Sequence, residues 1–294
     1  MRVTGIGFIG TENSHTRHFI RFLNEEGRHP GVRAVALADG HTERNAELAD
    51  VGGIETIVTE PAELIGVADA AIISTRDGAR HREQAEPLLA AGMPVLVDKP
   101  LATTPADAAA ILDAAADAGA VVYSSSALRA VPQIAELISE GADSGPLRSL
   151  HIVGPGDPDS PYSGLFFYGI HHVEAALELL GNPAVASGEI AATVQHHGDT
   201  TTALLRIADV DVTLTFVTPT DTERVPFHLT AVHTNGVVTR PIALHPDYNA
   251  PALATFVEAI SSGKSPVSRE TMMAPVVVLS AIVEALEATR QVQS

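Results

Sequence analysis

The stretch Ala85–Pro100, AEPLLAAGMPVLVDKP, shows the basic unit of this chain, because a helical pattern in it is followed at once by an apolar strand. The helix is expected to end at Gly92 and the strand to cover Val95–Val97. The strand runs into Asp98-Lys99-Pro100. Strand ends in an open α/β sheet face the ligand crevice, so this tripeptide is a candidate site.

Lys99 is the residue in this tripeptide to which we assign chemistry. The chain has only one other lysine, Lys264. An ammonium group at a strand end can donate to a substrate oxygen, and burial can lower its pKa. The alternative is an ordinary solvated loop lysine. We take Lys99 as a candidate catalytic and cofactor-binding residue.

The same alternation of strand and helix fills the first part of the chain. The expected strands are 3–9, 32–38, 54–58, 70–74, 95–97 and 120–124. The expected helices are 14–24, 43–50, 80–91 and 105–118, with a helical turn at 61–64. Strands that alternate with helices at this spacing predict βαβ units and a parallel, doubly wound sheet of the Rossmann type over residues 1–124.

The pattern changes after residue 124. Helices are expected at 131–140 and 168–180, then strands at 189–196, 201–207, 210–217, 227–233 and 237–240, and final helices at 250–261 and 270–289. Asn235-Gly236 is a strong hairpin signal. Residues 125–294 therefore predict a second α+β domain for substrate binding and oligomerisation, with a largely antiparallel, open-faced sheet. Its apolar residues need a cover, so we expect a homodimer or homotetramer.

Composition limits the partners of the protein. The 294 residues include 18 Lys and Arg against 36 Asp and Glu, a net charge of −18, and no cysteine. This charge argues against nucleic-acid and anionic membrane partners, which need clustered basic residues. No apolar run reaches the length expected of a membrane span, and the start has no signal-peptide layout, so we expect a cytoplasmic protein.

A glycine motif follows the first strand. Residues 5–10, GIGFIG, match G-x-G-x-x-G by letter, but the first two glycines lie inside the expected strand. The turn therefore begins at Gly10, and Glu12 and His15 occupy the second and third glycine positions. Such a carboxylate repels phosphate unless it turns away. The expected cofactor contacts in this turn are Gly10, Thr11, Asn13 and Ser14. Asn13 and Ser14 can cap the following helix, whose first N–H groups attract an anion.

Other cofactor contacts are expected at later strand ends. Asp39 can accept hydrogen bonds from a ribose diol and repel a 2′-phosphate, which favours NAD over NADP. The alternative is an Asx-type turn before Gly40. The remaining expected contacts follow the strands at 70–74 and 95–97, and are Ser74, Thr75, His81, Asp98 and Lys99.

The helix at 168–180 carries the second group of candidates. His171 and Glu174 share one helix face, but no third metal ligand is evident, so no metal is expected. We take His171 as a candidate acid/base. Arg129, Tyr168 and His172 are the candidate substrate contacts.

These motifs together resemble the Gfo/Idh/MocA oxidoreductases, the family of glucose–fructose oxidoreductase and inositol dehydrogenase. Residues 85–100 are similar to the family's A-x-x-A-L-x-A-G-K-x-V-x-x-E-K-P, and Gly169 to Gly181 to its G-x-H-x-x-D…L-L-G. The resemblance implies a Rossmann domain, an open-faced second domain that mediates oligomers, and hydride transfer on sugars or cyclitols. It implies that Lys99 contacts substrate and nicotinamide ribose, and that His171 is the acid/base.

Three positions depart from the family pattern. Phe167 stands where many members carry an aspartate, Arg76 stands where proline is frequent, and the glycine turn contains Glu12. We therefore expect an NAD-dependent oxidoreductase acting on a polyhydroxylated small molecule, with a non-catalytic sugar- or nucleotide-sensing protein as the alternative. A lyase or hydrolase that uses bound NAD transiently remains open as well.

Overall fold

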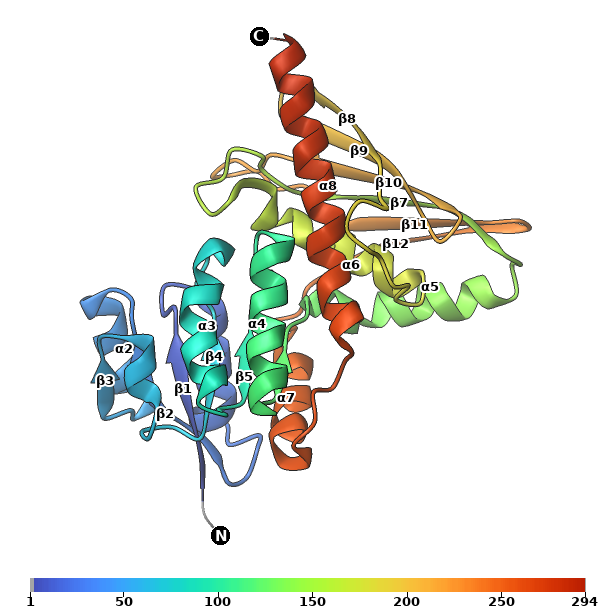
Figure 1. Cartoon of the computed structure of the whole chain (residues 1–294). Helices are drawn as coiled ribbons and strands as arrows, with labels where there is room; N and C mark the ends of the chain where they lie inside the picture. Colours follow the sequence, from blue (N-terminus) through green and yellow to red (C-terminus); the bar gives the residue numbers. More distant parts are fainter. Residues whose placement is uncertain (1–2, 294) are drawn as a thin grey trace. The chain divides into compact units, whose positions relative to one another are not determined.

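The computed structural model describes residues 3–293 and divides the chain into two compact units (Figure 1). The first contains residues 1–102, 106–125 and 247–269, and the second contains 103–105, 126–246 and 270–294. The expected boundary after residue 124 assigned the whole carboxyl-terminal part to the second domain. The structure instead groups 247–269 with the first unit.

The first unit is built on a six-stranded sheet in which all neighbouring strands are parallel. Its order is β3 (Thr56–Val58), β2 (Val32–Ala38), β1 (Thr4–Ile9), β4 (Ala70–Ile73), β5 (Val95–Val97) and β6 (Val122–Tyr123). The order reverses between β1 and β4, which is the switch point where doubly wound sheets bind ligands. The predicted Rossmann-type fold is confirmed.

Helices connect these strands. They are α1 (Ser14–Ile20), α2 (Thr42–Gly52), α3 (His81–Ala90) and α4 (Pro105–Ala118), with short turns η1 (Arg21–Glu25), η2 (Pro61–Leu64) and η3 (Gly78–Arg80). The expected helix over 14–24 contains a change of geometry, because η1 is a π-helical turn.

Helix α7 (Ala250–Ser262) completes the first unit. Its Leu253 and Phe256 are fully buried in one core cluster with Phe19 and Phe22. This apolar contact explains why 247–269 joins the first unit, although more than a hundred residues separate it in sequence from β6.

The second unit contains a mixed six-stranded sheet. Its order is β12 (Gly236–Pro241), β11 (His228–His233), β7 (Leu147–Pro155), β10 (Val210–Val217), β9 (Thr200–Ile207) and β8 (Ala192–His197). The pair β7–β10 is parallel and the other neighbours are antiparallel, so the sheet is largely antiparallel as predicted. Strand β7 was not predicted, because Arg148, Ser149 and His151 interrupt its apolar residues.

One face of this sheet is covered within the unit. Residues such as Leu150, Leu214 and Phe216 are buried, and α5 (Pro132–Ala142) and α6 (Gly169–Leu179) contact its strands. Short turns η4 (Ala127–Ala130) and η5 (Gly164–Phe166) precede these helices. The alternate positions on the strands are partly or fully exposed, as in Thr200–Ile207.

The final helix, α8 (Arg269–Gln293), was not recognised as a possible membrane span. Residues 269–291 are long and apolar enough to cross a bilayer by length and composition, with a mean hydropathy of 1.7. Most of that window is buried inside the protein, as in the core helix of a globular fold. Thr289 donates a hydrogen bond to the Val194 carbonyl oxygen, so the helix lies against β8.

Candidate functional site

The turn after β1 touches the end of β4. Gly10 has a φ of +79°, and a Cβ at this position would approach the Thr75 backbone nitrogen to 2.2 Å, so only glycine fits. Asn13 caps α1 by accepting from the His15 N–H, and its amide donates to the Ser74 carbonyl oxygen at 2.9 Å. The structure therefore brings several of the predicted cofactor residues together.

The Glu12 carboxylate turns toward the β4 loop. Its Oε1 accepts a hydrogen bond from the Arg76 backbone N–H at 2.9 Å. This local N–H therefore satisfies part of the hydrogen-bonding capacity of the Glu12 carboxylate. The objection that Glu12 raises against a phosphate-binding turn is thereby weakened.

Asp39 follows β2, as predicted, and has a left-handed backbone with φ +56°. Its carboxylate accepts from the Gly40 N–H at 2.7 Å, from Arg80 at 2.7 Å and from Gln84 at 3.2 Å. Partial burial would raise the pKa of Asp39, but Gly40 and the Arg80 guanidinium lower it, so the group is ionised at neutral pH.

A pocket opens beside Asp39. It has a volume of about 390 Å³, and residues from the ends of β2 and β3 and from α3 line it. Arg80 is among these residues, which our sequence analysis did not assign to the site. The sequence gives little indication of a role for Arg80, because an arginine in a polar strand-to-helix loop is usually solvated.

The other predicted cofactor residues on β4 and α3 are buried. His81 is fully buried, and its ring lies between the Pro100 carbonyl oxygen at Nδ1, 2.7 Å away, and the Thr75 carbonyl oxygen at Nε2, 2.9 Å away. Burial lowers the pKa of His81 even though both carbonyls favour its charged form. His81 thus joins the β4 loop to the segment after Lys99.

Asp98 and Lys99 are both buried at the end of β5. Asp98 Oδ2 lies 2.6 Å from His15 Nδ1, and Oδ1 accepts from the Lys99 backbone N–H at 2.9 Å. Burial would raise the pKa of Asp98, but the electrostatic interaction and hydrogen bond with the His15 ring, together with Lys99, lower it. The Asp98 carboxylate is therefore ionised beside Lys99.

In the second unit, a polar network surrounds His171. Ser126 Oγ lies 2.6 Å from His171 Nδ1, and the Ser126 N–H donates to Glu174 Oε2 at 2.7 Å. Arg129 Nε donates to the same Glu174 oxygen at 2.6 Å, and its Nη1 donates to Glu178 at 2.9 Å. Ser126 was not predicted, because it lies 45 residues away from His171 in sequence.

The three predicted substrate residues have different surroundings. His172 is fully buried against the rings of Phe216 and Phe227. Burial lowers the pKa of His172 to about 4, and the backbone groups around the ring only partly offset this shift. Neither ring nitrogen makes a hydrogen bond. The Arg129 guanidinium is committed to carboxylates. We therefore keep only Tyr168 in the candidate substrate site.

Tyr168 belongs to a partly exposed aromatic surface next to His171. The rings of Phe167 and Tyr168 are 4.8 Å apart, and Tyr168 and His171 are 6.1 Å apart. The Arg224 guanidinium carbon lies 5.1 Å from the Tyr168 ring centre. Arg224 was not predicted, since nothing in its local sequence distinguishes it from an ordinary loop arginine.

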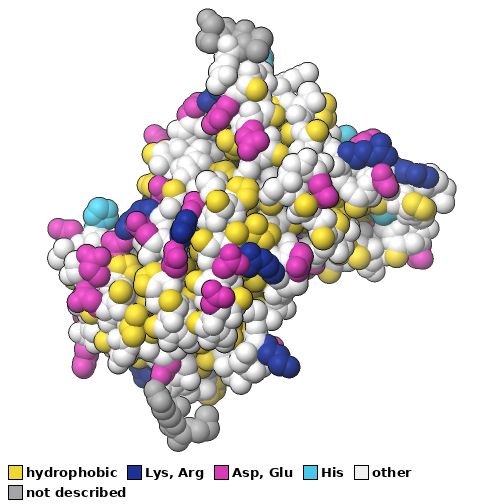
Figure 2. All heavy atoms as spheres, in the orientation of Figure 1, with side chains coloured by type: hydrophobic (Ala, Val, Ile, Leu, Met, Phe, Trp, Pro, Cys, Tyr) yellow, Lys and Arg dark blue, Asp and Glu magenta, His cyan; other side chains and the backbone are white. Residues whose placement is uncertain are grey.

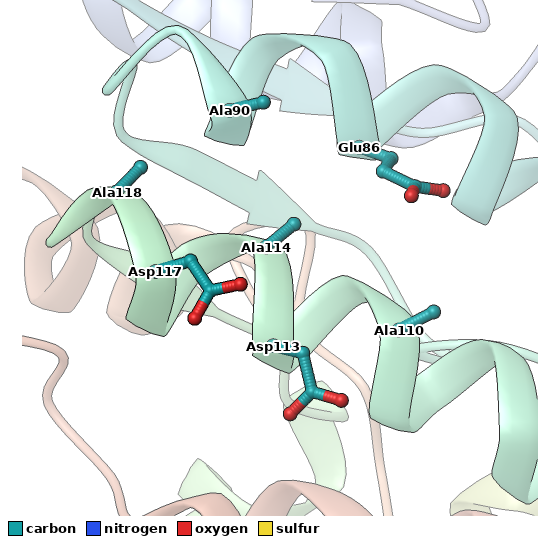
Figure 3. Close-up of a pocket in the computed structure, with 7 residues that line it drawn as sticks. All are labelled: Glu86, Ala90, Ala110, Asp113, Ala114, Asp117 and Ala118. Atoms are coloured by element: carbon teal, nitrogen blue, oxygen red, sulfur yellow. The ribbon is translucent and has the colours of Figure 1, made fainter.

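Two further features concern metal ligands and a surface groove. Among residues 3–293, no group of three metal-ligating side chains occurs. A groove of about 530 Å³ lies between α3 and α4 (Figure 3), lined by Glu86, Asp113, Asp117 and four alanines. It lies toward the carboxyl-terminal ends of these helices, opposite the strand ends that carry Asp98. Acidic side chains are also spread over the face in Figure 2 rather than gathered at one site.

Comparison with known proteins finds a family match for the first part of the chain. The Gfo/Idh/MocA oxidoreductase family, described as having an NAD-binding Rossmann fold, matches residues 4–126. This match supports the resemblance seen in the motif at residues 85–100.

Two curated relatives illustrate the similarity. The 1,5-anhydro-D-fructose reductase of Ensifer adhaerens is 36% identical over 133 residues, which are 43% of this chain and 40% of the reductase. Inositol 2-dehydrogenase 3 of Saccharopolyspora erythraea is 28% identical over 194 residues, 63% of this chain and 54% of the dehydrogenase. The chain thus spans about half or less of the length of these relatives.

Solved structures share the complete fold. GenD2 from gentamicin A biosynthesis, solved in complex with NAD, superposes with a TM-score of 0.83 at 19% identity, covering 99% of this chain and 96% of GenD2. The myo-inositol 2-dehydrogenase of Lactobacillus plantarum gives 0.82 at 16% identity, covering 98% of both chains. At these identities the likeness shows the fold alone.

Proposed function

We propose that this protein is an oxidoreductase that uses NAD to move a hydride to or from the carbinol carbon of a sugar, cyclitol or related polyol. The observation that carries the proposal is the ionised, buried Asp98 beside Lys99 at the end of β5, in a unit of this oxidoreductase family. The names of the relatives, a reductase and inositol dehydrogenases, support the substrate class.

The residues around the β1 turn fit a dinucleotide. Gly10 lets two backbones meet closely, Glu12 turns onto Arg76, and the Ser74 hydroxyl is buried with no hydrogen-bond partner in the described protein. The pocket beside Asp39 fits the adenosine end. Asp39 would accept from a ribose diol and repel a 2′-phosphate, which supports NAD rather than NADP. Bound NAD supplies the hydride acceptor or donor.

Side chains of this protein would stabilise the substrate oxygen and transfer the hydroxyl proton. Lys99 donates to the substrate oxygen and stabilises the charge that develops there. His171, whose Nδ1 is fixed by Ser126, exchanges the hydroxyl proton at Nε2. Tyr168 and Arg224 would contact the rest of the polyol. The sensing-protein alternative rested partly on Glu12, and the hydrogen bond from the Arg76 backbone N–H to Glu12 weakens that support.

We also infer a homodimer or homotetramer formed through the outer face of the second sheet. Leu204 on β9 and Val237 on β12 are 46% and 63% exposed there, and a second copy would cover them. The same function fits a cytoplasmic location, where NAD-dependent metabolism takes place. Light scattering tests the assembly, and a monomeric mass at working concentration would contradict it.

The decisive experiment combines binding and turnover. Calorimetry with NAD is followed by a panel of sugars, cyclitols and their amino and acid derivatives. Lys99→Ala should lower turnover by about 100-fold or more, the scale of one lost electrostatic or acid–base group. Lys264→Ala is the matched control, because it removes the only other lysine. No NAD binding and a silent panel would contradict the function, and wild-type rates in Lys99→Ala would exclude that residue.

A further inference from the structure

His15 stands where the dinucleotide fingerprint has its third glycine, yet its side chain is almost fully buried. That glycine normally allows close packing of the helix on the strand. Here an imidazole fills the space at the beginning of α1. A large polar group in such a place needs partners for both ring nitrogens, because an unpartnered buried polar group is costly.

Both ring nitrogens of His15 have partners from distant segments. Nδ1 lies 2.6 Å from Asp98 Oδ2, and Nε2 lies 2.9 Å from the Tyr248 hydroxyl. With Asp98 ionised, the consistent arrangement has Nδ1–H donating to the carboxylate and Nε2 accepting from Tyr248. The Tyr248 and His15 rings also meet edge to face at 5.6 Å.

The chain brings Tyr248 to this position through α7. That helix begins two residues later and buries Leu253 and Phe256 in the core of the first unit. The hydrogen-bonded series Tyr248–His15–Asp98 therefore lies wholly within one compact unit. Asp98 uses its other oxygen to hold the Lys99 backbone N–H at 2.9 Å.

We propose that His15 is a positioning residue for Lys99, acting through the Asp98 carboxylate, and that Tyr248 holds the His15 ring in the required tautomer. This rests on the proposed function in so far as Lys99 acts on substrate. The arrangement couples the turn that would face the cofactor to the segment that carries the catalytic ammonium. It also gives a reason for the departure from glycine at this position.

Two amide variants separate the two hydrogen bonds of His15. Asparagine places its amide nitrogen near the Nδ1 position and can still donate to Asp98, whereas glutamine reaches the Nε2 position and loses that bond. We expect His15→Asn to keep turnover within about threefold of wild type. His15→Gln and His15→Phe should lower kcat by about 10- to 100-fold, the scale of a hydrogen bond to a charged group.

The affinity for NAD, measured by calorimetry, should change less than about threefold in all three variants. A purely structural role predicts instead that kcat, NAD affinity and melting temperature fall together, with no difference between asparagine and glutamine. That result would overturn the proposal, and so would unchanged kcat in His15→Phe.

A readout that does not need turnover uses the two lysines of the chain. With 13C-labelled lysine, the side-chain NMR spectrum has one signal from Lys99 and one from Lys264, which is an internal control. His15→Gln should move the Lys99 signal and His15→Asn should leave it in place. If the wild type turns over no polyol, the proposed function fails, but this comparison still decides whether His15 positions Lys99. An unmoved Lys99 signal in both variants overturns the proposal.

Discussion

Removal of the charge on Glu174 should destabilise the second unit more than any exposed ion pair could. The side chains of Glu174 and Arg129 are 5% and 11% exposed, and Glu174 Oε2 lies 2.6 Å from Arg129 Nε. At this distance, an effective dielectric constant of about 20 gives an attraction of about 6 kcal/mol. Loss of hydration offsets part of it, so we expect a coupling free energy of about 2–3 kcal/mol.

The perturbation is a double-mutant cycle with Glu174→Gln and Arg129→Met. Each single variant should lower the free energy of unfolding by about 3 kcal/mol, because it breaks a buried ion pair and leaves the charge of the other partner buried. Urea unfolding can be followed by far-UV circular dichroism, since the chain has no tryptophan to report fluorescence.

The matched control is an exposed pair in the same unit. Arg206 and Asp209 are 66% and 97% exposed, with 3.7 Å between their charged atoms. The cycle of Arg206→Met and Asp209→Asn should give a coupling below about 0.5 kcal/mol. If the Glu174–Arg129 coupling were as small as this control, the argument that burial strengthens the network around His171 would be wrong.

Two further predictions concern acid stability and cofactor choice. The folded-state pKa of His172, about 4, lies below its unfolded value of 6.5, so the unfolded chain binds a proton that the folded chain refuses between these values. Stability should therefore fall by about 3 kcal/mol as the pH drops from 6.5 to 4, and His172→Phe should lose this part of the acid dependence in urea titrations at several pH values; an unchanged dependence would refute it. Asp39→Ser should raise the ratio of NADP to NAD affinity by about tenfold or more, because it removes a negative charge and frees Arg80, 2.7 Å away, to pair with a 2′-phosphate. Calorimetry with both cofactors measures this ratio, and an unchanged ratio in Asp39→Ser would assign the selectivity elsewhere.

The sequence was sufficient for the regular parts of the fold. Strands such as Val32–Ala38 and Val95–Val97 and the helix Pro105–Ala118 have the predicted bounds, because apolar runs, Pro at a helix start and Gly after a helix end act locally. Strand β7 was missed because its polar residues face outward from the sheet and its end contains Gly154-Pro155. The place of 247–269 was missed because only the packing of Phe256 on Phe22 determines it.

The candidate site divides in the same way. Residues at strand ends, such as Asp39 and Lys99, could be placed because parallel topology puts strand ends at one edge of the sheet. The hydrogen-bond partners within the site could not be predicted from sequence. His15 and Asp98 are 83 residues apart, and His15 and Tyr248 are 233 residues apart. The burial of His172 against Phe216 and Phe227 could not be predicted either, because these two rings come from segments more than 40 residues away.

The partner of His171 shows why such contacts matter for the proposed chemistry. Phe167 removes the carboxylate expected near this histidine, and Glu174 Oε2 accepts hydrogen bonds from the Ser126 N–H and from Arg129. The structure supplies a hydroxyl instead. Ser126 Oγ accepts the Leu128 N–H and lies 2.6 Å from His171 Nδ1, and a hydroxyl group can both donate and accept a hydrogen bond. It can therefore bond Nδ1 of either neutral tautomer and of the charged ring, whereas a carboxylate stabilises only a ring that carries a proton there. A histidine held in this way keeps a fixed orientation while it takes up and returns a proton, which is what a reversible alcohol oxidation requires of its acid/base residue.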